Sequence, residues 1–94
     1  MNHIAEQLAQ GQQVTFRPSG HSMTPLIRHK EPVTLRPLQP EETLEVGMIV
    51  LVRLKGRWLL HRIKAIREER YLIANARGHE SGWASRTQVK GIKL

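Results

Sequence analysis

Residues 47–67 read GMIVLVRLKGRWLLHRIKAIR, and this stretch decides the fold class. Two apolar runs, 47–54 and 58–67, are separated by the turn-forming pair Lys55-Gly56, a pattern that is typical of a tight β-hairpin. Side chains alternate between the two faces of a strand, so the second run divides into two sets. The first set is Leu59, His61, Ile63 and Ala65, and the second is Trp58, Leu60, Arg62, Lys64 and Ile66.

Short segments with strand character lie on both sides of this hairpin. They bring the predicted total to six strands, and the four further segments are 13–17, 32–37, 71–76 and 88–94. Turn-forming residues separate them, including the stretch 78–82. Residues 2–10 carry apolar side chains at helical spacing and stop at Gly11, which predicts a short helix. Pro32, Pro37 and Pro40 bracket the second strand, and we therefore expect that strand at a sheet edge.

The length and composition bound the architecture. A chain of 94 residues supports one domain, with a helical segment over 1–11 and a β core over 13–94, and its 39% hydrophobic content predicts a single packed layer. The absence of cysteine excludes disulfides, thiol nucleophiles and cysteine-based zinc sites. All eight acidic residues are Glu, which excludes a catalytic Asp. The longest apolar run, 48–52, is far too short to span a bilayer, so we expect a soluble cytoplasmic protein.

Positive charge is concentrated in the second half of the chain. The net charge is +7, yet residues 1–50 hold four Lys and Arg against five Glu, whereas residues 51–94 hold eleven against three. Such asymmetry is typical of a polyanion-binding protein, and a solvated basic sheet face produces it equally well. Nucleic-acid binding is therefore an alternative function, with Trp58, Tyr71 and Trp83 as candidate stacking groups.

A second informative stretch is residues 18–25, PSGHSMTP. Gly20 can adopt backbone angles that other residues avoid, and Pro25 suits the first turn of a helix that Ser22 or Thr24 would cap. We therefore expect a strand, a sharp turn and a short helix beginning near Ser22. A hydroxyl in this position is exposed beside backbone N–H groups that stabilise an oxyanion. A helix N-cap serine has the same local sequence, so both roles stay open.

A serine nucleophile needs a base, and the chain offers five histidines. His61 lies in a predicted core strand between Leu59 and Ile63, and these apolar neighbours favour its neutral, proton-accepting form. A hydrogen-bonded histidine at the edge of a core, with no catalytic role, has the same sequence pattern, so that alternative stays open. Of the other four histidines, His3 falls in the terminal helix, His21 is adjacent to Ser22 and is expected to point away from it, and His29 and His79 fall in polar turns.

Four segments, taken in order, carry a resemblance to a known family. They are GHSMTP at 20–25, LEVGMIVLV at 44–52, HRI at 61–63 and VKGI at 89–92. They resemble the sequence boxes of the signal peptidase and LexA-type serine peptidase superfamily, and the resemblance runs from about residue 14 to residue 92. It implies a mainly β fold: a small LexA/signal-peptidase-like β-barrel or β-clip with a short N-terminal helix.

The resemblance also implies an activity, that of a soluble serine endopeptidase. The first box of the superfamily holds the nucleophile, which corresponds to Ser22. The third box holds the general base, a lysine in most members and a histidine in archaeal and endoplasmic-reticulum signal peptidases, which corresponds to His61. The oxyanion would be bound by the backbone N–H groups of Gly20, His21 and Ser22.

Two further expectations concern a third catalytic member and the substrate. Where the family carries a Gly-Asp-Asn box this chain has Gly78-His79-Glu80, so Glu80 is the candidate third member. An extended protein or peptide substrate is expected to bind as an added strand beside Thr15 and Arg17. No cofactor, metal ion or membrane span is expected. Besides nucleic-acid binding, the alternative is an inactive peptidase-fold module that binds a partner without cleaving it.

Overall fold

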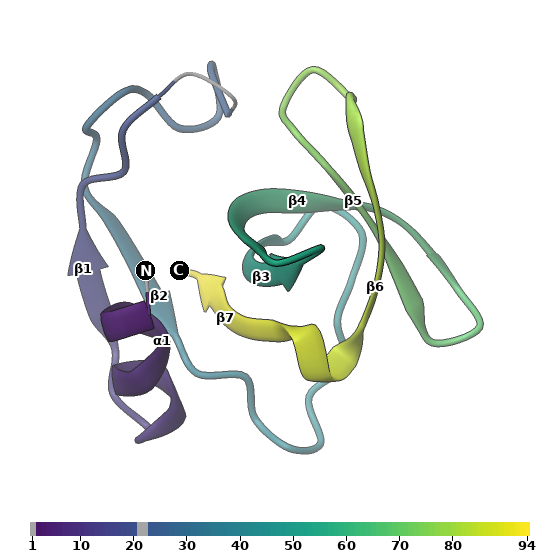
Figure 1. Cartoon of the computed structure of the whole chain (residues 1–94), viewed down its shortest axis with the longest axis horizontal. Helices are drawn as coiled ribbons and strands as arrows, with labels where there is room; N and C mark the ends of the chain where they lie inside the picture. The colour runs from purple at the N-terminus through teal and green to yellow at the C-terminus, as the bar shows by residue number, and fades with distance from the viewer. Residues whose placement is uncertain (1, 21–22) are drawn as a thin grey trace.

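The computed structural model describes residues 2–20 and 23–94, which form one sheet, one helix and a short 3-10 turn. The seven strands pair antiparallel in the order β1-β2-β7-β3-β4-β5-β6, which confirms the mainly β fold (Figure 1). The elements are α1 Asn2–Ala9, β1 Val14–Phe16, β2 Val33–Arg36, β3 Ile49–Leu54, β4 Arg57–Arg67, β5 Arg70–Ala74, β6 Glu80–Ser85, η1 Arg86–Gln88 and β7 Val89–Lys93.

The predicted hairpin is confirmed as β3 and β4. Leu54 pairs with Arg57, and the two residues between them, Lys55 and Gly56, have φ angles of 53° and 75°. Positive φ at both central residues is the geometry of a tight turn that matches the twist of the flanking strands. This turn sets the register that places Val50 opposite His61.

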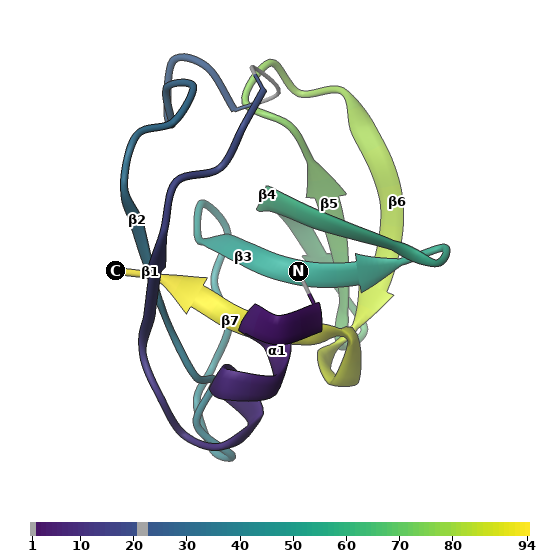
Figure 2. The same cartoon turned by 60° about the vertical axis from the view of Figure 1, so that its left-hand side comes forward.

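The sheet curls into a half-barrel because β4 is long. Its residues 57–62 pair with β3 and its residues 62–67 pair with β5, so one strand belongs to both walls. Figures 1 and 2 show β5 and β6 swinging round from the plane of β3 and β7. The curl brings β6 back to the β3–β4 turn: a Cβ at Gly82 would lie 3.6 Å from Lys55 Nζ.

Apolar side chains fill two clusters rather than the single layer that composition predicted. The first cluster contains Ile63, with Leu59 packed against it, and the second contains Leu60, with Trp58 packed against it. Alternation along β4 therefore holds as expected, but both of its faces are covered. The second cluster forms because α1 and the β1–β2 segment close over the outer face of the hairpin, where Leu8 and Leu35 are buried.

Two sequence expectations about the strands are wrong. The stretch 78–82 was expected to be a turn, whereas β6 begins at Glu80 and Gly82 pairs with Ile73. The second predicted strand lies between β1 and β7, not at an edge. Pro32 and Pro37 stand just outside Val33–Arg36, so neither removes an N–H group from the strand itself. Within the described residues no helix is long and apolar enough to cross a membrane.

Candidate active site

The segment that follows β1 forms one wall of the candidate site. Residues 23–26 form a turn, closed by the Ile27 N–H donating to the Met23 carbonyl at 2.7 Å, and the Thr24–Pro25 peptide is cis. The predicted helix after Ser22 is therefore wrong, since a single turn does not repay the cost of helix nucleation. His21 and Ser22, the predicted oxyanion donor and nucleophile, lie outside the described residues.

Residues on both sides of Ser22 are held in place. Met23 and Ile27 are only 4% and 3% exposed and belong to the second apolar cluster. On the N-terminal side, Lys30 donates its backbone N–H to the Pro18 carbonyl at 2.7 Å, and Arg17 Nη1 donates to the Lys30 carbonyl at 3.1 Å. The turn at 28–31 thus supports the stretch that leads to the predicted nucleophile.

His29 makes a third bond to this stretch. Its Nδ1 accepts the backbone N–H of Gly20 at 2.8 Å. Gly20 had been expected to offer that N–H to an oxyanion, and in the structure the group already has a partner. The acceptor is a side chain nine residues further along the chain, so local sequence gave no signal for it.

His61 lies on β4 and is 9% exposed. Its Nδ1 is 2.7 Å from the carbonyl oxygen of Leu60. A carbonyl oxygen only accepts hydrogen bonds, so Nδ1 is the donor and carries a proton. In the neutral ring the lone pair then resides on Nε2, which is the tautomer that can accept a proton from a hydroxyl.

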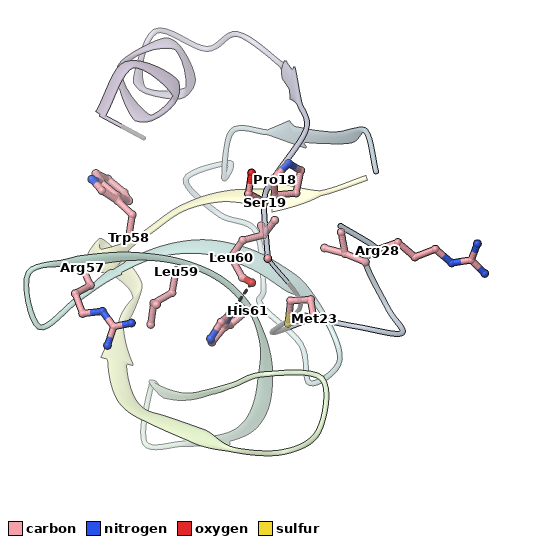
Figure 3. A pocket seen from close by; sticks show the side chains of 11 residues that line it. Pro18, Ser19, Met23, Arg28, Arg57, Trp58, Leu59, Leu60 and His61 are labelled. Atoms are coloured by element: carbon pink, nitrogen blue, oxygen red, sulfur yellow. Dashed lines mark hydrogen bonds between the residues drawn. The ribbon is translucent and has the colours of Figure 1, made fainter. Parts of the chain in front are cut away.

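A pocket of about 280 Å³ joins these parts of the chain. On one side it is lined by Pro18, Ser19, Gly20 and Met23, which flank the predicted nucleophile, with Ile27 and Arg28. On the other side it is lined by Arg57 to His61 of β4. Figure 3 shows Met23 beside His61, with Leu59 and Arg57 following along the strand. The structure thus brings the flanks of Ser22 and the predicted base to one cavity.

A comparison with protein families agrees with this arrangement. The family described as Peptidase S24-like matches residues 3–90, a span that holds the Ser22 stretch, the hairpin and His61. The chain belongs to the Peptidase S24-like family. The LexA/signal-peptidase resemblance is thereby confirmed, as is the fold that it implied. Among curated proteins, no sequence matches the chain.

In this S24-like chain the predicted third member, Glu80, has a different partner. Its Oε2 accepts a hydrogen bond from Lys64 Nζ at 2.7 Å, and its side chain is 48% exposed. The group that orients the His61 ring is the Leu60 carbonyl. Sequence reasoning missed that contact because every residue carries a carbonyl group. The part of Glu80 in catalysis remains a prediction.

The predicted substrate-strand residues lie at a sheet edge of the S24-like fold. Within residues 2–20 and 23–94, β1 is the first strand in the sheet order and pairs with β2 on one side alone. Thr15 Oγ1 is 2.7 Å from Thr34 Oγ1 across the β1–β2 pair, and Arg17 is tied to Lys30. Within the part of the chain that the structure describes, no three histidine or glutamate side chains gather closely enough to hold a metal ion.

Proposed function

We propose that this S24-like chain is a serine endopeptidase in which Ser22 is the nucleophile and His61 the general base. One observation carries the proposal: His61 and the residues on both sides of Ser22 line the same 280 Å³ pocket. The tautomer of His61 supports it further. With Nδ1 bound to the Leu60 carbonyl, Nε2 is the ring atom that can take the Ser22 proton.

The chemistry follows the general pattern of nucleophilic catalysis. The Ser22 oxygen attacks the peptide carbonyl carbon while Nε2 of His61 takes the hydroxyl proton. The tetrahedral intermediate collapses, the C–N bond breaks, and the same proton passes to the leaving amine. Water then hydrolyses the ester with His61 acting as base again. The Leu60 carbonyl, by accepting a hydrogen bond from Nδ1–H, stabilises the ring when it becomes positively charged.

The proposed oxyanion site contains two backbone N–H groups, one fewer than the sequence predicted. The Gly20 N–H donates to His29, which leaves the predicted N–H groups of His21 and Ser22 for the developing negative charge. A substrate strand beside β1 would run directly toward the pocket. Pro18 and Ser19, which line it, follow β1 after a single intervening residue, Arg17.

Peptide hydrolysis by variants tests the proposal. A synthetic peptide library is incubated with the protein, and new N-termini are quantified by mass spectrometry. Ser22→Ala should lower the rate at least about 10³-fold, and His61→Ala about 10²- to 10⁴-fold. The double variant should be no slower than Ser22→Ala, because the two groups act as one unit.

Matched controls remove a serine and a histidine far from the pocket. Ser85→Ala acts at the start of η1 and His3→Ala on the exposed face of α1, and both should keep wild-type rates. Hydrolysis that survives Ser22→Ala, or a double variant far slower than both single variants, would show that these residues do not form a catalytic pair. Absence of hydrolysis in the wild type would favour the inactive binding module.

A further inference from the structure

A second hollow lies on the other side of His61. It has a volume of about 380 Å³ and is bounded by β4, the β3–β4 turn and the start of β6. Three of its lining residues, Arg57, Leu59 and His61, also line the first pocket. The two hollows therefore meet on one face of β4, and Figure 3 shows these three side chains on the same side of the strand.

The two hollows differ in chemistry. The first is floored by buried apolar side chains, among them Met23, Ile27 and Leu60. The second carries cationic and titratable groups at Lys55, Arg57 and His79, together with Glu80. The first hollow also contains Arg28 and Arg57, so an extended chain that crosses His61 would meet buried apolar side chains on one side and cationic side chains on both.

The positive charge of the second hollow is not neutralised within the described residues. The ion pairs among the described residues are Arg36–Glu42 and Lys64–Glu80, and neither involves Lys55 or Arg57. Glu80 is the one acidic residue in the lining, and its carboxylate already binds Lys64, which stands outside the lining. An anionic side chain of a ligand would therefore meet two cations and no free carboxylate.

Lys55 is exposed and lines this hollow. It occupies the tight turn with φ of 53°, and its Cε and Nζ lie 3.6 Å from the position that a Cβ would take at Gly82. Because Gly82 has no side chain, the lysine stem packs directly on β6. The ammonium group therefore lies beside β6 at the edge of the hollow.

We propose that the hollow formed by Lys55, Arg57 and His79 is a specificity subsite that selects peptide substrates with a glutamate or aspartate a short distance from the cleaved bond. The proposal rests on the proposed function, since it treats His61 as the point of cleavage. Arginine and lysine recognise carboxylates through charge-assisted hydrogen bonds.

An acidic peptide fits these observations better than a nucleic acid does. The basic hollow shares three lining residues with the one that contains the buried apolar side chains, so a ligand that fills both would combine an acidic group with apolar groups. Peptides combine the two within a few residues, whereas a nucleic acid repeats its charge at every nucleotide.

Binding, measured without cleavage, tests the subsite. A randomised library of short peptides is passed over immobilised Ser22→Ala protein, and the retained sequences are compared with the input. A retained peptide is then remade with its acidic residue changed to the amide, and both versions are titrated by fluorescence anisotropy. The acidic version should bind about three- to tenfold more tightly, and the difference should shrink at high salt.

Variants assign the preference to the subsite. Lys55→Gln and Arg57→Gln should each reduce the ratio of acid to amide affinity, and the double variant should bring it close to one. Arg67→Gln makes the same change at the far end of β4 and should leave the ratio unchanged.

Each other outcome overturns the subsite. Retained peptides without acidic residues would refute it and leave the proposed peptidase standing. Loss of the preference in Arg67→Gln would show that the preference for acidic peptides comes from the overall positive charge of the chain and not from the subsite. No retained peptide at all, or displacement of the acidic peptide by single-stranded DNA at physiological salt, would also refute it, and the library hydrolysis assay would then decide separately whether the chain cleaves peptides.

Discussion

The bond between Gly20 and His29 allows the position of the nucleophile to be tested without touching the proposed catalytic pair. Gly20 stands two residues before Ser22, and its N–H donates to His29 Nδ1 at 2.8 Å. Its φ of 106° is a positive value that residues with a side chain rarely adopt, so the backbone at this point depends on glycine. Removal of the acceptor in His29→Ala leaves the amide unsatisfied and the stretch free to shift.

The expected effect is larger on rate than on stability. One neutral hydrogen bond contributes about 0.5–1.5 kcal/mol, which for a domain of this size lowers Tm by roughly 2–12 °C. Misplacement of a reacting group by about 1 Å costs up to about 10²-fold in rate. We therefore expect kcat/KM of His29→Ala to fall about 10- to 100-fold at a temperature where the variant is fully folded.

A conservative variant distinguishes this role from simple destabilisation. The Oδ1 of asparagine is as many bonds from Cα as the Nδ1 of histidine, so His29→Asn should regain most of the rate. His29→Gln carries its oxygen one bond further and should regain less. Peptide hydrolysis and thermal unfolding are measured on all three, with His3→Ala as control. A His29→Asn variant as slow as His29→Ala would refute the positioning role.

Three further predictions concern packing, pH and the identity of the base. A Cβ at Gly91 would lie 2.8 Å from Leu8 Cδ1 and 3.3 Å from the Arg36 carbonyl oxygen, so Gly91→Ala should destabilise the fold by about 1–3 kcal/mol in chemical denaturation, and a Leu8→Ala background should reduce that penalty. Hydrogen bonds from Arg36 lower the pKa of Glu42 to about 2 from an ordinary 4.5, so this pair stabilises the fold fully above pH 4.5. That contribution should be lost as the pH falls from 4.5 toward 2, and acid titration of Glu42→Gln should lack this part of the loss. Lys64 donates to Glu80, so Lys64→Ala should keep its hydrolytic rate, whereas loss of activity in Lys64→Ala with His61→Ala still active would make Lys64 the base.

Local sequence chemistry accounts for the parts of the fold that could be predicted. Lys55-Gly56 specifies a tight turn, and alternation on either side of it placed Leu59 and Ile63 on one face and Leu60 on the other. β6 was not predicted because Gly82 has low strand propensity. The strand forms because it pairs with β5, and that pairing is a tertiary contact. The helix predicted after Ser22 does not form, because residues that cap a helix well do not by themselves lengthen one turn into a helix.

In the candidate site, too, local sequence predicted one part and tertiary contacts determine the rest. His61 was identified because its own strand places it among apolar residues, and the structure puts it in the pocket that Gly20 and Met23 line. The contacts that tune the site are tertiary or backbone contacts. His29 reaches Gly20 across a loop, and the Leu60 carbonyl fixes the His61 tautomer, and neither contact has a residue pattern that a sequence displays.

Covalent labelling can identify the nucleophile and its dependence on His61 in one experiment. A fluorophosphonate reacts with serines that a neighbouring base activates, and its adduct can be located by peptide mass spectrometry. We predict one adduct, on Ser22, formed by the wild type and by His3→Ala and lost in His61→Ala. An adduct on another serine, or equal labelling of Ser22 with and without His61, would contradict the assignment of these two residues as nucleophile and base.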